Sequence, residues 1–311
     1  MANTPIHGDM YMVGIFEEVT YGTKGTPTIW RKYTCEANPS TTIVNKPGYK
    51  TNNLIPQTEN MTTTYKNGVC TLSGTLTKWD SWLLEALTAD TDSPYVFSPT
   101  TMSRPSYTIY KFYVDAGYAD EITGAVLETP LEISESEGVI TFTANFRVRD
   151  VDYNQSCTYT PATVESGEFL LPLSTLRWYN TDYISMNTFT LSVGNTYASD
   201  PMTYQNTTDR LKVGETVVGV SGTLNWTWKY TYDDTNIAMD DLQTLHEGLN
   251  KSYAVLTLTT ADSDTWTIRF DGYFQDPPTL PNVDNDLLAG NATLTMAYNS
   301  ATYPGLSVTV A

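Results

Sequence analysis

Hydrophobic and polar residues alternate along much of the chain, and this period of two predicts β-strands. The clearest run places apolar residues at every second position: Ile140, Phe142, Ala144, Phe146 and Val148. The positions between them are polar: Thr141, Thr143, Asn145 and Arg147. The turn formers SESEG precede this run, and Leu131 and Ile133 alternate before the turn. The pattern predicts an antiparallel hairpin with one face in the core and the other in water.

Two predicted strands carry the same tetrapeptide. SGTL occurs at residues 73–76 within VCTLSGTLTKW and at residues 221–224 within VVGVSGTLNWTWKY. Leucines at helical spacing follow each copy: Leu83, Leu84 and Leu87 in the first, and Leu242, Leu245 and Leu249 in the second. Each copy therefore predicts a strand that leads into a short helix.

The similarity between the two regions continues along the chain. The shared landmarks, in order, are alternating runs from Tyr107 and Trp266, the glycines Gly124 and Gly272, the prolines Pro130 and Pro277, and closing strands at 140–143 and 292–295. Landmarks in the same order, about 150 positions apart, indicate an internal duplication. We therefore predict an all-β chain of two duplicated domains, 1–155 and 156–311, each with one short flanking helix. Their join is expected within residues 151–164, which are rich in turn formers.

The alternation stops between residues 39 and 64. This segment, PSTTIVNKPGYKTNNLIPQTENMTTT, is polar and is interrupted by proline and glycine. A loop of this length inside a compact domain is usually functional or mobile. The sequence therefore predicts a long loop at residues 39–64 that acts as an arm, in addition to an N-terminal arm.

The composition narrows the class of protein. Hydrophobic residues make up 40% of the 311 residues and charged residues 17%, and threonine and tyrosine are abundant, which favours strands. The formal net charge is −18, so the surface repels phosphate and tight binding of nucleic acid is disfavoured. The sequence has neither a signal peptide nor an apolar run of membrane-spanning length. We expect a soluble chain made in a cytoplasm, without membrane insertion.

Residue types that usually carry chemistry are few. The two histidines, His7 and His246, lack the motifs of a catalytic triad, and no phosphate-binding or dinucleotide-binding loop occurs. The three cysteines have no metal-binding or redox spacing, so we expect reduced thiols. Three acidic pairs do not complete a calcium loop: Asp90 and Asp92, Asp262 and Asp264, and Asp284 and Asp286. We therefore predict no enzymatic activity, no catalytic residue, no cofactor and no metal site.

The tryptophans leave a binding function open. Trp226 and Trp228 share a strand face, and Trp79 and Trp82 flank the start of the first predicted helix. If these rings are exposed, they would form a platform for a carbohydrate. If they are buried, they pack the core or a subunit contact, which is the commoner role of aromatic residues on strands.

Several segments resemble the major tail tube proteins of long-tailed, siphophage-like bacteriophages. GIFEEVTYGTKGTPT, from Gly14 onward, contains a Glu-x-Thr-Tyr-Gly-Thr motif at residues 18–23 that is similar to the opening of this family. GAVLETPLEISESEGVITFTANFRVRD, residues 124–150, looks like the closing hairpin of the family. SGTL followed by a leucine helix also fits. The resemblance covers most of the chain at the level of element order.

The resemblance implies a structural virion protein. Tail tube domains are small β-sandwiches or half-barrels with one flanking helix, and usually six domains form a ring in which strands join across subunits around a channel. Rings stack through loops and arms into a hollow tube that conducts double-stranded DNA during ejection. If each half of this chain is one tube domain, three chains make a ring with pseudo-six-fold symmetry. A hexamer follows if only one half, or both halves as a single unit, lines the channel.

The resemblance also implies partners and a location. The expected partners are further copies of the chain, the tape measure protein, the tail terminator and double-stranded DNA in transit. The expected location is the phage tail of a virion assembled in the bacterial host cytoplasm.

Two sets of residues are expected to serve this function. Because duplex DNA must pass without sticking, we expect the wet face of the closing hairpins to line the lumen: Glu128, Glu132, Thr141, Thr143, Thr293 and Thr295. We expect ring stacking to use the centre of the arm: Lys46, Tyr49, Asn53, Leu54 and Ile55.

Other functions stay open at the level of sequence. A β-sandwich carbohydrate-binding protein would bind glycans through its tryptophans. A glycoside hydrolase would use two facing carboxylates and show turnover. Among virion proteins, a tail terminator or a capsid decoration protein would form a trimer or a single ring that never extends.

Overall fold

The computed structural model describes eleven segments of the chain: residues 11–45, 61–97, 103–162, 166–178, 183–184, 186–197, 217–229, 252–274, 279–284, 287–297 and 304–311. Within them the protein is almost entirely β-structure, which confirms the predicted all-β class. The first half contains β1 (Tyr11–Glu17), β2 (Ile29–Arg31), β3 (Thr34–Asn45), β4 (Met61–Thr75), α1 (Trp82–Thr88), β5 (Tyr95–Val96), β6 (Tyr107–Tyr113), β7 (Tyr118–Ser136), β8 (Val139–Val148) and β9 (Asp150–Ser156). The second half contains β10 (Phe169–Trp178), β11 (Tyr183–Ile184), β12 (Met186–Tyr197), β13 (Val217–Lys229), β14 (Ser252–Thr260), β15 (Thr265–Phe274), β16 (Thr279–Asp284), β17 (Leu287–Met296) and β18 (Leu306–Val310).

The first half is a sandwich-like pair of sheets that share the long strand β7. One sheet has the order β2, β1, β6, β7 and β9, and the other has β3, β4, β8 and β7. β7 passes from one sheet to the other at Gly124, whose φ is 63°. A side chain there would lie 2.7 Å from Cβ of Arg149 and 2.9 Å from the ring of Tyr21. Gly124 is therefore required both by its backbone conformation and by its close neighbours.

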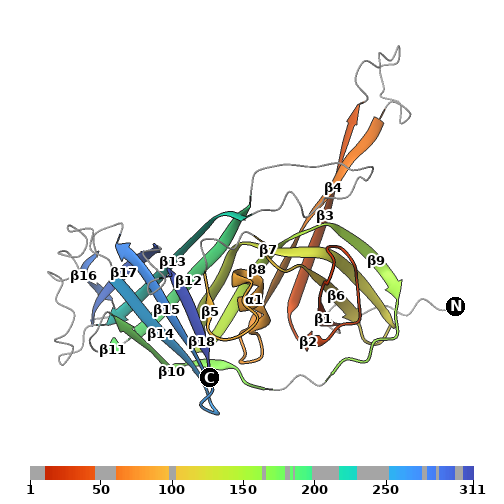
Figure 1. The fold of residues 1–311 in the computed structure, drawn as a ribbon. Helices are drawn as coiled ribbons and strands as arrows, with labels where there is room; N and C mark the ends of the chain where they lie inside the picture. The colour runs from red at the N-terminus through yellow and green to blue at the C-terminus, as the bar shows by residue number, and fades with distance from the viewer. Residues whose placement is uncertain are drawn as a thin grey trace.

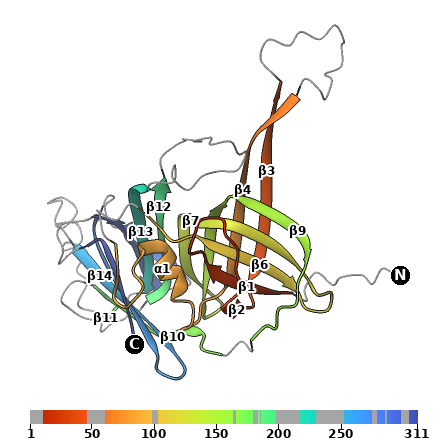
Figure 2. The same cartoon turned by 45° about the vertical axis from the view of Figure 1, so that its right-hand side comes forward.

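The strands of the second half form a closed circuit that includes the β7–β8 hairpin. Pairing runs through β8, β7, β12, β13, β17, β15, β14 and β10, and β10 returns to β8 where Leu170 lies opposite Val139. Between β7 and β12 the two halves of the chain pair over four positions, from Ser134 opposite Thr190 to Leu131 opposite Val193. The regions predicted as two domains therefore share one hydrogen-bonded sheet, although they lie on opposite sides of the molecule (Figures 1 and 2).

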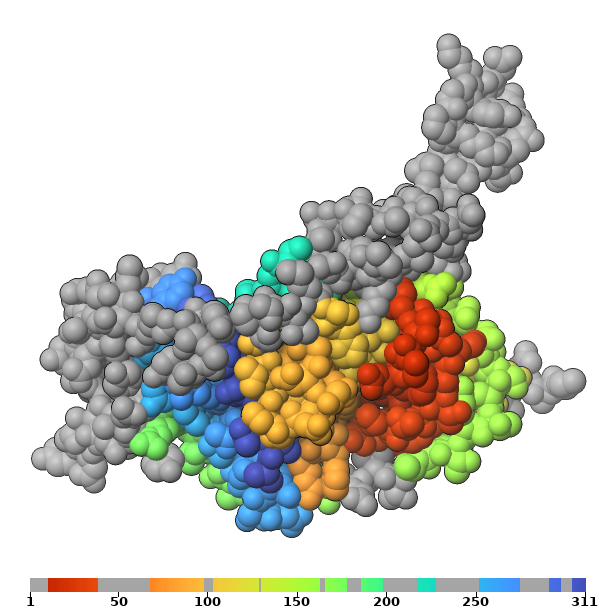
Figure 3. Space-filling view, viewed as in Figure 1, coloured from red at the N-terminus to blue at the C-terminus, as the bar shows by residue number. Residues whose placement is uncertain are grey.

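One apolar core runs through both halves. It joins Phe142 and Phe146 of the first half to Trp226 and Phe270 of the second, and each of these side chains is at most 2% exposed. The predicted leucines of the first helix, Leu83, Leu84 and Leu87, are buried in the same core. In the space-filling view the segment that contains α1 (orange) lies between the red residues of β1–β3 and the blue residues of the second half (Figure 3). The expected second helix, near Leu242–Leu249, lies outside the described residues.

The segment predicted as a loop at residues 39–64 is partly strand, so that prediction is wrong at both ends. β3 continues to Asn45 and β4 begins at Met61, and the two pair from Thr34 opposite Ser73 to Asn45 opposite Met61, with one shift of register between Thr42 and Ile43. The resulting hairpin projects from the body of the molecule (Figures 1 and 2). A two-stranded ribbon outside the core is held by backbone pairing, so it needs no alternation of apolar residues.

Pro39 does not interrupt this hairpin because β3 is an edge strand. The N–H of Cys35 donates to Tyr11 Oη at 3.1 Å, and its C=O accepts from Lys111 Nζ at 3.2 Å, so both groups point away from β4. Along a strand of an antiparallel ladder, the N–H and C=O groups of successive residues point alternately toward and away from the paired strand. The backbone nitrogen of Pro39, four positions later, therefore also points away from β4, where a missing N–H costs no ladder bond.

The predicted join at residues 151–164 also begins with a strand. β9 covers Asp150–Ser156 and pairs with β7. Val151 is buried, whereas Asp152, Tyr153 and Asn154 are exposed. The strand shows no alternation because it forms the edge of its sheet and its outer residues face solvent. The first half therefore ends close to Ser156, at the end of β9.

Candidate functional site

Polar side chains from both halves form two continuous rows across the main sheet. The first row contains Thr143 (β8), Glu132 (β7), Ser192 (β12), Thr223 (β13) and Thr295 (β17). The second row contains Thr141 (β8), Ser134 (β7), Thr190 (β12), Asn225 (β13) and Thr293 (β17). Each residue lies directly opposite the next in its row, and residues paired in this way project from the same face of a sheet. We call this surface the polar face.

The polar face brings together residues that the sequence predicted separately. Glu132, Thr141 and Thr143 come from the first half and Thr293 and Thr295 from the second, yet register connects them through β12 and β13. The sixth predicted residue, Glu128, lies further along β7 and forms an ion pair with Arg147 of β8. Thr190 and Ser192 of the intervening strand β12, which were not among the predicted residues, complete the rows. Its alternation of threonine and serine with buried Leu191 and Val193 was the available signal.

SGTL has the same role in both halves. Ser73 and Thr75 of β4 lie opposite Thr143 and Thr141, so they extend the two rows, and Thr223 of the second copy is a member of the first row. The leucines of both copies are completely buried. A side chain at Gly74 would lie 3.1 Å from the ring of Tyr33, and one at Gly222 would lie 2.7 Å from Val193. The glycine thus leaves space for a core side chain while its neighbours keep the opposite face polar.

Polar groups on this face are directed at one another. Thr71 Oγ1 donates to Asn145 Oδ1 at 2.8 Å, and Thr293 Oγ1 donates to Asn225 Oδ1. The hydroxyls of Thr188 and Thr227 lie 2.6 Å apart. A donor that already has an acceptor within the protein gains little from a passing phosphate oxygen. The face is therefore wettable, and these donors are not available as phosphate ligands without breaking a bond.

The residues chosen for ring stacking cannot be placed. Lys46, Tyr49, Asn53, Leu54 and Ile55 all lie outside the described residues, as do both histidines. The five stacking residues belong to the segment 46–60, which follows Asn45 of β3 and precedes Met61 of β4 (Figure 1).

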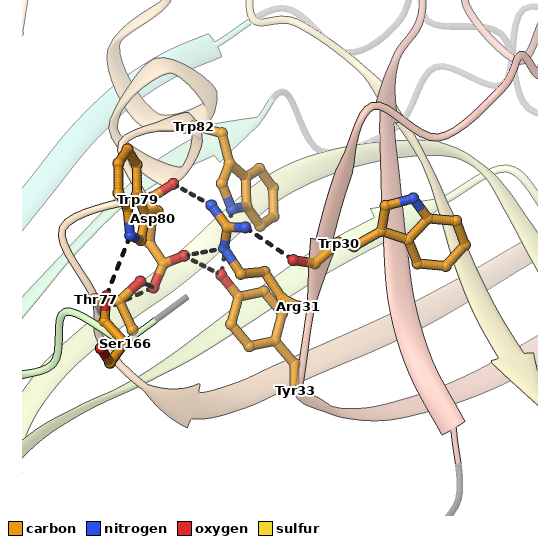
Figure 4. A network of polar contacts seen from close by, with 8 residues as sticks. All are labelled: Trp30, Arg31, Tyr33, Thr77, Trp79, Asp80, Trp82 and Ser166. Carbon is orange, nitrogen blue, oxygen red and sulfur yellow. Dashed lines mark hydrogen bonds and ion pairs between the residues drawn. The ribbon is translucent and has the colours of Figure 1, made fainter. Parts of the chain in front are cut away.

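A buried polar network fixes the turn before α1 (Figure 4). Asp80 is fully buried, and its carboxylate accepts hydrogen bonds from Arg31 Nε at 2.7 Å, from Tyr33 Oη at 2.6 Å and from the N–H and hydroxyl of Thr77 at 2.8 Å each. Burial, and then the neighbouring Asp80 carboxylate, raise the pKa of Tyr33, which keeps its hydroxyl protonated as a donor. Arg31 also donates to the carbonyl of Trp79 at 2.6 Å. The network ties β2 and β3 to the segment between β4 and α1.

The Glu-x-Thr-Tyr-Gly-Thr motif at residues 18–23 has a structural explanation. The carboxylate of Glu18 accepts from the N–H of Gly22 at 2.6 Å, from Thr108 Oγ1 at 2.7 Å and from the N–H of Gly124 at 2.8 Å. Glu18 therefore closes the Glu-x-Thr-Tyr-Gly-Thr turn and holds it against the bend of β7. Tyr21 belongs to the same turn, and the guanidinium carbon of Arg149 lies over its ring, 6.0 Å from the ring centroid.

The described tryptophan side chains do not form an exposed platform. Trp30, Trp82, Trp226 and Trp266 are at most 6% exposed and pack on other aromatic rings. Trp79 is 44% exposed, and Lys78 Nζ lies 4.8 Å from its ring centroid. The side chain of Trp228 lies outside the description. The interpretation of Trp82 and Trp226 as core residues is confirmed.

A cavity of about 290 Å³ lies at the root of the hairpin. It is lined by residues 35–38 of β3 together with Lys111, Asp120, Ile122 and Tyr153. The Lys111 ammonium is 4.4 Å from the ring centroid of Tyr11 as well as bonded to the Cys35 carbonyl. Asp120 accepts from Tyr113 Oη at 2.8 Å and from the N–H of Asn154 at 3.0 Å. Lys111 thus connects β6 to the root of the hairpin, and Asp120 connects β7 to β6 and β9 beside it.

Acidic and thiol side chains of the described segments have structural partners or lie apart from one another. There, no group of three His, Cys, Asp or Glu residues is arranged to hold a metal ion. Asp90 accepts from the N–H of Val96, and Asp264 forms an ion pair with Lys78 at 2.7 Å. Cys35, Cys70 and Cys157 are free thiols, and the sulfurs of Cys35 and Cys70 lie 3.8 Å apart.

The fold defines an all-β, sandwich-like protein with a polar sheet face to which both halves contribute. In comparisons with known proteins, no family model and no curated protein matches the chain. Within the described residues, no helix has the length and apolar character needed to cross a membrane.

Proposed function

We propose that this chain is a structural subunit that polymerises into a hollow tube of the phage-tail type and that the polar face lines the channel. The observation that carries the proposal is the register of the two polar rows. A run of small hydroxyl and carboxylate side chains continues without a break over five strands and across the junction of the two halves. The resemblance of residues 14–28 and 124–150 to tail tube proteins supports the same function.

The charge of the protein suits a channel for DNA. With a net charge of −18, the subunit repels the phosphate backbone at long range. Hydroxyl side chains keep the channel wall wet without offering fixed cations, so duplex DNA could pass without losing counterions to the wall. The proposed role of the channel wall is therefore to leave the passing DNA unbound.

Polymerisation follows from the edges of the sheet. Among the described strands, the printed register pairs β3 with β4, and the outer edge of β3 at Ala37 and Pro39 faces away from that partner. An exposed edge is normally an aggregation risk, but in a closed ring a neighbouring subunit covers it. Because both halves contribute to one continuous face, one chain supplies two units of channel wall. This favours a ring of three chains with pseudo-six-fold symmetry over a hexamer.

The β3–β4 hairpin is proposed to contact the next ring in the stack. Its outer part extends beyond Gly68, the last position of β4 that pairs with β8, so it contributes nothing to that sheet. A variant in which a two-residue turn joins Pro39 directly to Gly68 should keep the fold and lose the ability to extend tubes. Circular dichroism would test the fold and electron microscopy the tubes. Long tubes formed by this variant would reject the stacking role.

The first experiment is negative-stain electron microscopy of the purified chain over a concentration series. We expect hollow tubes or stacked rings with a channel wide enough for duplex DNA, and class averages should show six similar lobes. Mass photometry of isolated rings would separate three chains from six. Monomers at every concentration, even with added preformed tubes or crowding agent, would contradict the proposal, and glycan-array binding would then test the carbohydrate-binding alternative.

A further inference from the structure

Arg147 stands out on the polar face because of its charge. It belongs to the outward-facing set of β8, with Thr141, Thr143 and Asn145. Among the described side chains of β7, β8, β12, β13 and β17, it is the only lysine or arginine. A guanidinium is the side chain best suited to grip phosphate, since its planar donors match two phosphate oxygens. On a surface that DNA must pass, an accessible Arg147 would be a binding site.

Two neighbours cover this guanidinium. On one side, Nη2 of Arg147 donates to Oε1 of Glu128 in an ion pair. On the other side, the ring centroid of Tyr197 lies 5.4 Å from the guanidinium carbon, within the range of a cation–π contact. The side chain of Arg147 is only 18% exposed as a result. Its charge is neutralised by the first neighbour and its face is covered by the second.

The backbone brings both neighbours to Arg147. In the β7–β8 ladder Leu127 lies opposite Phe146, but Leu131 already lies opposite Ala144, so β7 contains two extra residues between these points. Such a bulge re-aims side chains, and this one contains Glu128. Tyr197, at the end of β12, is 5% exposed and donates from its hydroxyl to the carbonyl of Leu127 at 2.8 Å. The first half of the chain thus supplies the carboxylate and the second half the ring.

We propose that Glu128 and Tyr197 mask Arg147 from phosphate and so keep the polar face free of a DNA-binding cation. This inference rests on the proposed function and deepens it, because it names the residues that decide whether the face repels or holds a polyanion. Glu128 acts as a positioning residue: it works through Arg147 and does not itself contact the passing DNA. In an assembled tube one unmasked arginine per subunit would become a repeated series of phosphate sites.

The test compares two glutamates on the same face. Glu128→Gln and Glu132→Gln each remove one negative charge, but only the first releases a cation, since Glu128 is paired with Arg147 and Glu132 lies among serine and threonine side chains. Binding of a short fluorescent DNA duplex to the full chain is measured by anisotropy near physiological ionic strength, where the Debye length is about 8 Å and remote charges are screened. The double variant Glu128→Gln with Arg147→Gln is the third member of the set.

We expect Glu128→Gln to bind the duplex roughly fivefold more tightly than Glu132→Gln, with a salt dependence steeper by about 0.9 for one added phosphate contact per subunit. The double variant should return to the level of Glu132→Gln. Equal binding by the two single variants, including no binding by either, would overturn the proposal. The proposal would also be overturned if the double variant bound the duplex as tightly as Glu128→Gln. If the ion pair between Glu128 and Arg147 served stability alone, Glu128→Gln would change the unfolding midpoint and would not bind the duplex more tightly than Glu132→Gln.

Failure of this inference can be told apart from failure of the proposed function. The duplex assay uses the unassembled chain, in which the polar face is open to solvent, so it needs no tube. If tubes form and Glu128→Gln gains no affinity, the masking is wrong and the tube remains supported. If no tubes form under any condition but the duplex results are as expected, the masking is right and the tube is wrong.

Discussion

At the scale of single residues, buried carboxylates hold the turns that connect the strands. Glu18 collects two backbone N–H groups and a hydroxyl at the bend of β7, and Asp80 collects donors from three segments ahead of α1. Both are buried, and both have donors for their oxygens, as a buried charge requires. The acidic residues of this chain therefore include a small structural set that a net charge alone does not reveal.

Removal of the Asp80 carboxylate should strongly destabilise the fold. Asp80→Ala leaves Arg31, Tyr33 and Thr77 without their common acceptor, and breaking a buried ion pair on one side costs about 3–5 kcal/mol. Urea unfolding followed by tryptophan fluorescence would measure the loss. Asp264→Ala, which breaks the more exposed ion pair with Lys78, is the control and should change the midpoint little. Equal midpoints for the two variants would show that the Asp80 network is not stabilising.

Glu85 on α1 should make stability depend on pH. Burial, and then the nearby carboxylates of Glu17 and Asp92, raise the pKa of Glu85 from 4.5 to about 7. Between these values the folded protein holds a proton that the unfolded chain has released. The contribution of Glu85 is therefore complete below pH 4.5 and is lost as the pH rises through 7.

Glu85→Gln tests this dependence, because glutamine mimics the protonated acid. The variant should match the parent protein at low pH and should be more stable above pH 7, as measured by urea midpoints over a pH series. Because Glu85 is partly exposed, solvent screens its charge and limits the size of this difference. A constant difference between the two proteins over the whole series would contradict the assignment.

At the scale of elements, edge strands are where the sequence was hardest to interpret. The alternation of β8 and of β15 predicted both strands and their buried faces, because one side of each packs on the core. The outward residues of β9 face solvent, and the outer part of the β3–β4 hairpin pairs through its backbone, which leaves no mark on the side-chain pattern. The pairing of β7 with β12 was not predictable either, since a period of two shows which face is buried but not which strand is the neighbour.

The orientation of the β3 edge can be tested with proline. The N–H of Ala37 points away from β4, like those of Cys35 and the nitrogen of Pro39, whereas the N–H of Glu36 points toward β4. Ala37→Pro should therefore be tolerated, and Glu36→Pro should lower the free energy of unfolding by about 1 kcal/mol or more, because it removes a ladder bond. Urea unfolding of both variants would decide. Equal destabilisation would show that the register or the edge is assigned incorrectly.

At the scale of the whole molecule, the two similar halves behave as one body. The sequence predicted two domains from repeated landmarks, and some of these fall on corresponding strands: SGTL begins on β4 and lies on β13, which pair with the closing strands β8 and β17. Tyr107 and Gly124 lie on β6 and β7, whereas their expected counterparts, Trp266 and Gly272, both lie on β15, so this part of the predicted correspondence is wrong. What the repeat did not indicate is that the halves join edge to edge through β7 and β12 and share a core. The polar face exists only because of that junction.

Unfolding should therefore occur in a single cooperative step. With a shared ladder and core, neither half has a complete set of partners alone, so tryptophan fluorescence and far-ultraviolet circular dichroism should give coincident urea transitions. Leu191→Ala, at the buried side of the β7–β12 junction opposite Ile133, should lower the free energy of unfolding by about 2–5 kcal/mol and shift both signals together. Two separated transitions would indicate that the halves fold independently.

The pairing of β5 with β18 bears on how the subunit is made in the cell. Tyr95 and Val96 lie opposite Val308 and Ser307, so β5 can form this pairing only after a segment about 200 residues further along the chain has been synthesised. Non-local pairing of this kind slows folding and leaves intermediates with open edges. A chain in which β18 has not yet formed leaves the edge of β5 unpaired at Tyr95 and Val96 and lacks part of the native sheet. If the proposed tube function is right, a subunit can join a tube in its native form only after β18 has paired with β5.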